Sequence, residues 1–135
     1  MDKSQGDLSV LVDVFVFVYP VATVSADDLE ADFILVTHGH ADHVADVASI
    51  ANRTGATVVA PVEVAAWFQS QQNVENTIQL NLGGGIQLPF GHVRMTIAHH
   101  SSSMPDGSYG GNPAGYILTL AEGKVYFSGD TALFM

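Results

Sequence analysis

Short apolar runs alternate with stretches of helical spacing in the first half of the chain. Leu11–Tyr19, Phe33–Thr37 and Thr57–Ala60 are almost continuous hydrophobic runs, which are typical of strands buried in a sheet. Apolar residues recur at helical spacing in Asp42–Thr54 and in Pro61–Gln71. This pattern predicts strands and helices that alternate along the chain.

Turn-forming residues separate these stretches. Gly55 directly follows the first helical stretch and is a common C-terminal stop, while Pro61 fits the first turn of the second helix. The segment Ala26–Ala31 is predicted to be a polar connection that contains a short turn.

The second half has the pattern of antiparallel strands joined by glycine turns. The predicted strands are Ile78–Leu82, Ile86–Phe90, Val93–His99, Tyr116–Leu120 and Val125–Phe127. The long segment Ser101–Gly115 is rich in Ser, Gly and Pro and is predicted to be a loop. Early helices and late antiparallel strands indicate the α/β (α+β) class, in a single domain over residues 1–135.

The composition suits a folded domain and narrows the class of partner. Of the 135 residues, 47% are hydrophobic and 13% are charged, so a core can form and disorder is disfavoured. Only 4 Lys and Arg stand against 14 Asp and Glu, which gives a net charge of −10. Because the basic residues are scattered, we expect neither nucleic acid nor a membrane surface as a partner.

The amino-terminal apolar stretch and the lack of cysteine bear on location. Asp13 and Pro20 interrupt the stretch Leu8–Val24, which makes it a poor membrane helix and a poor signal peptide. The chain has 0 cysteines, so disulfides and cysteine ligands are excluded. We expect a cytoplasmic protein.

Four potential metal ligands occur within a short segment between a predicted strand and a predicted helix. They are His38, His40, Asp42 and His43, and Gly39 allows the chain to curl. The first two histidines can converge on one cation, while the aspartate and the third histidine face a second cation nearby. Imidazole and carboxylate suit zinc, with manganese or iron as alternatives, and paired cations of this kind serve metal-assisted hydrolysis.

A complete site also needs ligands from elsewhere in the chain. His99 and His100 end a predicted strand, and only one of them can point to the metal because neighbouring strand residues face opposite ways. Asp130 lies just past the last predicted strand, where it can bridge two cations or serve a turn or helix cap. The serines at 101–103 either line the pocket or hydrogen-bond the ligands, or else they cap the loop.

These residues lie in segments that resemble the metallo-β-lactamase superfamily. The motif His38-x-His40-x-Asp42-His43 resembles the superfamily as a whole. Longer segments are similar to one branch, the uncharacterised bacterial and archaeal metal-dependent hydrolases related to the ascorbate-phosphate lactonase group. These segments are Ala31–Asp46, Arg53–Pro61, His100–Gly115 and Gly129–Phe134, and the resemblance runs from about Leu11 to the end of the chain.

The resemblance implies an αββα sandwich with a metal site at one edge, between the two sheets. The residues implied to bind metal are His38, His40 and His100 for one cation, Asp42 and His43 for the other, and Asp130 for both. The resemblance favours His100 over His99 because the family's ligand precedes the serine run. From the chemistry of these ligands we expect zinc, as one or two ions, with manganese as the alternative.

Departures from the family pattern lead to further expectations. Nothing before about Leu11 matches the family's first β-hairpin. The family pattern also continues beyond Gly129–Phe134 with a strand-and-helix half and a final His ligand to the second metal. We therefore expect an incomplete sandwich, mostly the amino-terminal half, whose exposed apolar sheet surface leads it to form a homo-oligomer.

The expected activity is hydrolysis of a small-molecule substrate. Metal-activated hydroxide would attack an ester, lactone or phosphoester, with Asp42 and His43 as catalytic residues. The alternative is a truncated, non-catalytic metal-binding or interaction module of the same fold, which the missing final histidine favours. Metal content measured together with turnover distinguishes the two hypotheses.

Overall fold

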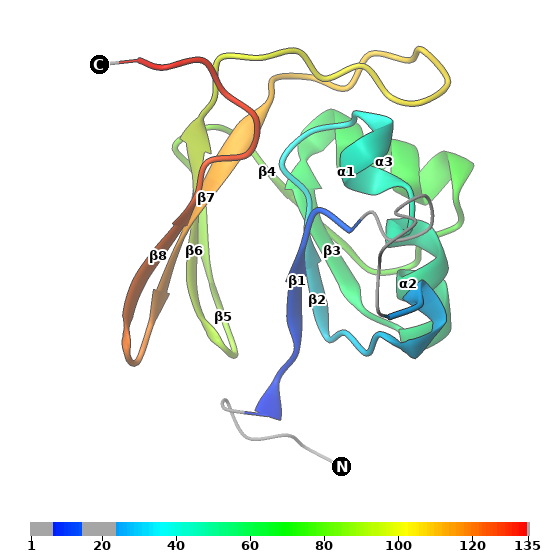
Figure 1. Cartoon of the computed structure of the whole chain (residues 1–135), viewed down its shortest axis with the longest axis horizontal. Helices are drawn as coiled ribbons and strands as arrows, with labels where there is room; N and C mark the ends of the chain where they lie inside the picture. The colour runs from blue at the N-terminus through cyan, green and yellow to red at the C-terminus, as the bar shows by residue number, and fades with distance from the viewer. Residues whose placement is uncertain (1–6, 15–23, 135) are drawn as a thin grey trace.

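Two four-stranded sheets lie face to face in this computed structural model, which describes residues 7–14 and 24–134 (Figure 1). The first sheet has the order β1-β2-β3-β4 and is parallel, whereas the second has the order β5-β6-β7-β8 and is antiparallel. The strands are β1 (Val10–Val12), β2 (Phe33–Leu35), β3 (Thr57–Pro61), β4 (Thr77–Leu80), β5 (Gly85–Leu88), β6 (Gly91–Ile97), β7 (Ala114–Leu120) and β8 (Gly123–Phe127).

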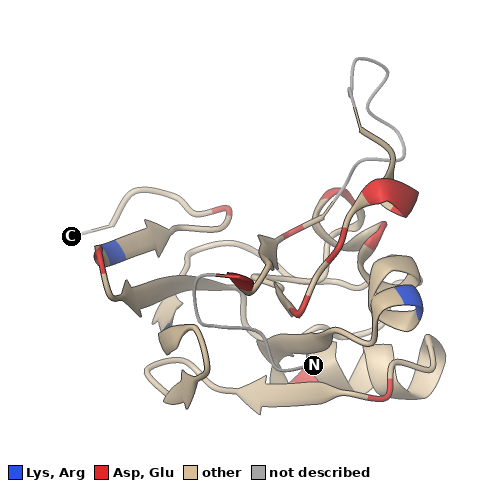
Figure 2. Cartoon of the chain, turned by 90° about the horizontal axis from the view of Figure 1, so that it is seen from below, with Lys and Arg blue, Asp and Glu red and all other residues tan. Residues whose placement is uncertain are grey.

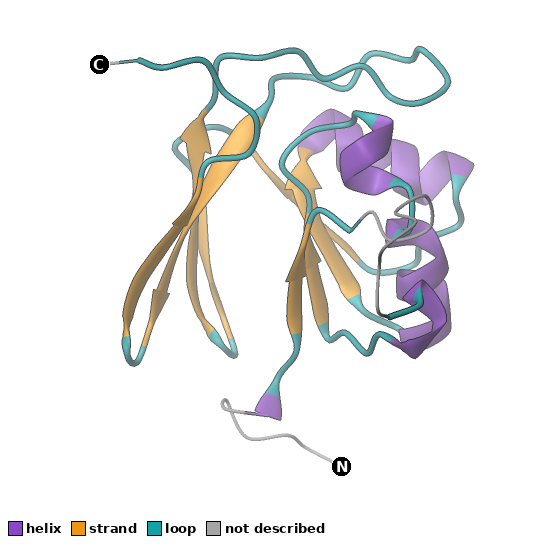
Figure 3. Ribbon diagram, viewed as in Figure 1, coloured by secondary structure: helices purple, strands orange, loops and turns teal. Residues whose placement is uncertain are grey.

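Within the described residues, helices cover the outer face of the first sheet and leave that of the second sheet bare (Figure 3). The helices are α1 (Ala41–Val44), α2 (Val47–Thr54) and α3 (Val62–Gln71), with a 3-10 turn at Ala26–Asp28. Every residue of β8 is exposed. The layers are therefore helix, sheet and sheet, in agreement with the expected α/β class and the incomplete sandwich.

The central parallel strands β2 and β3 are buried on both faces, as their continuous apolar runs predict. Ile34 and Val58 pack with the helices, whereas Leu35 and Val59 pack with the second sheet, since alternate strand residues face opposite ways. All four are 0% exposed, and Tyr116 of β7 is equally buried in the core between the sheets. This burial fixes the strand ends from which the site is built.

The prediction of one continuous helix over Asp42–Thr54 is wrong, because the segment forms two separate helices, α1 and α2. The Asp46 N–H donates to the carbonyl oxygen of Val14 at 3.2 Å, so a distant segment interrupts the helical hydrogen bonding. Gly55 does end α2, with a left-handed φ of 77°. The break leaves Asp42 and His43 on the short helix α1.

The predicted strand Leu11–Tyr19 is shorter than expected, because β1 ends at Val12. Asp13 has a φ of 48°, in the left-handed region, and this turns the chain out of the extended path. The part of the prediction over residues 15–19 lies outside the described residues.

The predicted strand Ile78–Leu82 is present as β4, but its place among the antiparallel strands is wrong. β4 pairs with β3 in parallel and belongs to the first sheet. Helix α3 connects the two strands, and parallel pairing requires a crossover connection of this kind. The antiparallel pattern therefore begins at β5, and β5 to β8 lie where strands are predicted.

The surface is sparsely basic. Figure 2 shows the described Lys and Arg residues apart from one another, and they are Arg53 on α2, Arg94 on β6 and Lys124 on β8. None of the helices in residues 7–14 and 24–134 combines the length and the apolar character needed to span a membrane.

Candidate metal centre

The predicted ligands meet at one edge of the two sheets, where β2, β6 and β8 end (Figure 1). The loop after β2 carries His38 and His40, and α1 carries Asp42 and His43. The other two ligands come from the second sheet, since His100 follows β6 and Asp130 follows β8. Segments far apart in the sequence therefore supply one site, as the sequence predicts.

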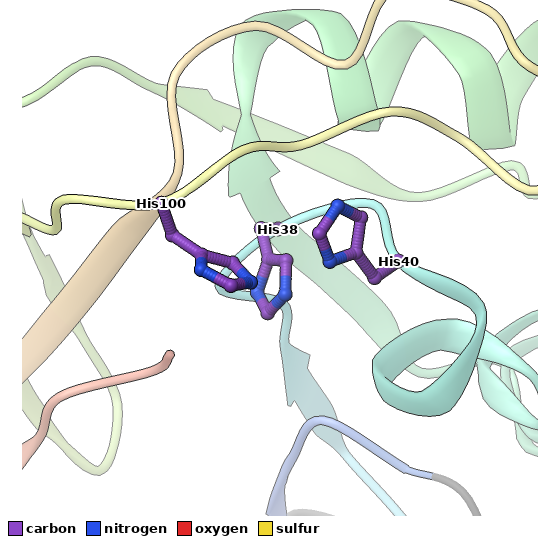
Figure 4. Close-up of side chains that lie close together, drawn as sticks. All are labelled: His38, His40 and His100. Atoms are coloured by element: carbon purple, nitrogen blue, oxygen red, sulfur yellow. The ribbon is translucent and has the colours of Figure 1, made fainter. Parts of the chain in front are cut away.

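Three imidazoles form the first cluster. His38, His40 and His100 each offer a ring nitrogen, and these nitrogens lie within 4.8 Å of one another. Ring centroids are 4.6 Å apart for His38 and His40, 5.2 Å for His38 and His100, and 5.0 Å for His40 and His100. Figure 4 shows the three rings converging from two separate stretches of backbone. Three convergent imidazole nitrogens are a common ligand set for a divalent transition metal.

His38 shows that the cluster fits a cation. Its side chain is fully buried, and among the described residues its Nε2 atom has no hydrogen-bond partner. Burial lowers the pKa of His38 from 6.5 to about 4, so the ring is neutral and has a lone pair available. An unsatisfied buried polar atom costs about 1–3 kcal/mol, which a metal–nitrogen bond would offset. The Nδ1 atom, by contrast, lies 2.9 Å from Thr37 Oγ1.

A more open cluster lies beside the first. Each of its three residues offers one ligand atom, and these atoms lie within 4.8 Å of one another. The residues are Asp42, His43 and Asp130. The His43 Nε2 atom is 3.1 Å from Asp130 Oδ2 and 3.7 Å from Asp42 Oδ2. The side chains of Asp42 and Asp130 are 62% and 43% exposed. This acidic cluster is thus made mostly of solvated carboxylates.

Asp130 lies next to both clusters. Besides its contact with His43, its Oδ2 atom is 3.7 Å from His100 Nε2 and 3.9 Å from His38 Nε2. A carboxylate in this place can share its oxygens between two cations. The contacts place Asp130 beside both clusters, and its role as a bridging ligand stays a prediction.

Asp13 is a site residue that the sequence interpretation misses. Its Oδ2 atom lies 2.9 Å from His43 Nδ1, and its Oδ1 atom accepts a hydrogen bond from the Thr37 N–H at 2.8 Å. The hydrogen bond with Asp13 raises the pKa of His43 from 6.5 to about 9 in the metal-free protein, against the opposing effect of burial. A carboxylate on the far nitrogen of a ligand histidine fixes the orientation of its ring. The sequence pattern hides this role, because Asp13 falls inside the predicted strand Leu11–Tyr19 and only the structure ends β1 at Val12.

Two of the roles considered for the serine run, contact with a ligand and capping of the loop, occur at different serines. Ser101 Oγ lies 3.1 Å from His40 Nε2, so it contacts a predicted ligand. Ser102 Oγ accepts from the Gly39 N–H at 3.0 Å and donates to Gly110 O at 3.1 Å, so it ties the loop together.

His100, and not its neighbour, joins the imidazole cluster. The ring of His99 lies 4.9 Å from the ring of Phe134, away from the groups of potential ligands.

A cavity of about 570 Å³ opens beside the acidic cluster, and its lining includes Asp42, His43 and Tyr126. The site is therefore accessible to a small molecule.

Comparisons with known proteins agree with this geometry. A UPF0173 metal-dependent hydrolase of Thermoplasma volcanium is 45% identical over 130 residues, which cover 96% of this chain and 56% of that relative. Another, from Shouchella clausii, is 45% identical over 135 residues, with 96% and 58% covered. The chain thus spans somewhat more than half the length of the curated relatives that it matches.

A solved structure and a family pattern give the same assignment. The structure of a metallo hydrolase from the hyperthermophilic archaeon Ignicoccus hospitalis has a TM-score of 0.74 and 28% sequence identity, covering 93% of this chain and 54% of that one. The family described as "Beta-lactamase superfamily domain" matches residues 11–135. The expected resemblance and fold are thereby confirmed, and the chain belongs to the β-lactamase superfamily domain family.

Proposed function

We propose that this chain carries the metal site of a metal-dependent hydrolase. One cation binds to His38, His40 and His100, a second binds to Asp42 and His43, and Asp130 contacts both. The observation that carries this proposal is the fully buried His38, whose unpaired Nε2 atom lies among the other two imidazoles. The names of the relatives as metal-dependent hydrolases support the same conclusion.

Zinc is the proposed metal, as one or two ions. The donors are imidazole nitrogens and carboxylate oxygens, and the chain has no cysteine. Three imidazole nitrogens suit zinc in the first cluster, while the carboxylates of the acidic cluster also suit manganese. The order of binding follows from this chemistry, with the imidazole cluster filled first.

The proposed reaction is hydrolysis of an ester, lactone or phosphoester of a small molecule. Divalent cations at such a site lower the pKa of water and polarise the bond that is cleaved. Asp42 is the most exposed of the three residues of the acidic cluster and lines the cavity, where it can orient the attacking water. Asp13 holds the ring of His43 in place from the opposite side. A cytoplasmic location remains a prediction.

We also propose that the chain forms a homo-oligomer. An apolar cavity of about 390 Å³ opens between β1 and β8, lined by residues that include Val10, Val12, Leu120, Val125 and Phe127. The edge strand β8 is exposed along its length, and an exposed edge with apolar side chains favours association. Analytical ultracentrifugation should show a dimer or larger species, and a monodisperse monomer would contradict this proposal.

Metal content and turnover, measured on the same sample, test the hydrolase proposal. The chain would be stripped with a chelator, loaded with Zn²⁺ or Mn²⁺, and assayed on generic esters, lactones and phosphodiesters. Two bound cations with turnover that disappears on chelation support the proposal. One cation or none, without turnover, supports the alternative of a non-catalytic metal-binding module. The His99→Ala variant is a matched control, because its ring lies outside the cluster.

A further inference from the structure

Two segments interleave at the imidazole cluster. The first runs from His38 to His40, and the second runs from His100 to Ser102. The rings of His38 and His100 lie 5.2 Å apart, and the Gly39 N–H donates to Ser102 Oγ at 3.0 Å. A Cβ atom on Gly39 would clash with the Sδ atom of Met104 and lie 3.2 Å from the carbonyl oxygen of Ser103, so a larger residue here would force its neighbours to shift. Ser102 is 6% exposed, and its hydrogen bond with Gly39 joins the two segments.

Ser101 has a different contact. Its side chain is exposed, and its Oγ atom lies 3.1 Å from the Nε2 atom of His40. Figure 4 shows the other nitrogen of His40, the one next to the ring's attachment point, on the side that faces His38. The two nitrogens therefore have separate surroundings, with Nε2 at the serine hydroxyl and Nδ1 towards the cluster.

This arrangement matters because an imidazole ring can turn. The final torsion of a histidine side chain is broad and roughly two-fold, so a half-turn swaps each ring nitrogen with a ring carbon at little cost. A neutral imidazole binds a metal through the lone pair of one nitrogen while the other nitrogen keeps its hydrogen. The partner of that N–H then decides both the orientation of the ring and the atom that binds the metal.

We propose that Ser101 is a positioning residue that accepts the Nε2–H of His40 and thereby makes Nδ1 the metal-binding atom of that histidine. This inference rests on the proposed metal site. The two serines have different roles. Ser102 joins the two segments by its hydrogen bond with the Gly39 backbone, whereas Ser101 orients the His40 side chain. Ser103 is exposed and has no side-chain hydrogen bond among the described residues, which makes it the matched control.

The first test uses the unaltered chain. It is labelled with heavy nitrogen in its imidazoles and loaded with an NMR-active cadmium isotope, and couplings between cadmium and nitrogen identify the bound atoms. We expect His40 to couple through Nδ1. Coupling through Nε2 overturns the assignment to Ser101 while the proposed metal site stands. The absence of any coupling to His38, His40 and His100 overturns both proposals.

The second test compares three variants by Zn²⁺ competition titration and by the same cadmium couplings. We expect Ser101→Ala to weaken zinc binding by roughly 10-fold, in the range for lost outer partners of ligand histidines, and to give a mixture of Nδ1 and Nε2 coupling. Ser101→Thr keeps a hydroxyl and should restore both results. Ser103→Ala should behave as the unaltered chain. Equal losses in Ser101→Ala and Ser103→Ala, or no change in Ser101→Ala, would overturn the proposal.

Discussion

The imidazole cluster and the acidic cluster differ in how the fold holds them. His38 is 0% exposed, and Ser102 ties the loop that carries it to the loop after β6. In the acidic cluster the side chain of Asp42 is 62% exposed, and Asp13 holds the far side of the His43 ring. Preorganised donors bind without further ordering of side chains, whereas exposed carboxylates lose conformational freedom on binding. We therefore expect the two clusters to bind cations with different affinities.

Removing a ligand from the imidazole cluster should have the largest effect. We expect His100→Ala to weaken the first zinc site by more than about 100-fold, because loss of a ligand exceeds the typical 10–100-fold cost of losing an outer partner. Competition titration with a chromophoric chelator measures the change. His99→Ala should bind zinc as the unaltered chain does, since its ring lies against Phe134. If both variants lost zinc affinity equally, the assignment of His100 and not His99 to the imidazole cluster would be wrong.

The first cluster was also the easier one to predict from sequence. His38 and His40 stand together in a motif directly after an apolar run, and His100 follows another predicted strand. The choice of His100 over His99 came from the resemblance, because strand alternation shows only that the two differ. The same local patterns located most of the strands, since continuous burial leaves a continuous apolar run.

Three features that sequence reasoning missed depend on contacts between distant segments. Asp13 lies 30 residues from His43 and 24 from Thr37, and no local pattern pairs them. The break between α1 and α2 arises where the Asp46 N–H donates to Val14 O. Strand β4 pairs with β3 through a crossover that hydrophobic periodicity does not specify. Such tertiary contacts override local propensity and are invisible to it.

Weakening the support of the acidic cluster should give an intermediate effect. Asp13→Asn keeps a residue that tolerates the left-handed φ of 48° but removes the charge that holds His43. We expect binding of the second cation to weaken by roughly 10–100-fold, while binding of the first changes much less. Stepwise titration with metal analysis at each step separates the two sites. Asp27→Asn, on the exposed 3-10 turn, is the charge-matched control. If the first site weakened as much as the second, the two clusters would not be held independently.

Altering the scaffold beneath the site should have the smallest effect on metal binding. The buried Tyr116 hydroxyl donates to Val36 O at 2.7 Å, just before the segment that carries His38. We expect Tyr116→Phe to lower the free energy of unfolding of the metal-free protein by about 1 kcal/mol, the usual net value of one hydrogen bond, as measured by urea denaturation. Tyr109→Phe, at a side chain 75% exposed, should leave it unchanged. Zinc binding at the imidazole cluster should persist in both variants, because Ser102 and the surrounding core still hold the loops. If Tyr116→Phe lowered the zinc affinity along with the stability, the imidazole cluster would depend on this hydrogen bond between the sheets. The cluster would then be less preorganised than its comparison with the acidic cluster implies.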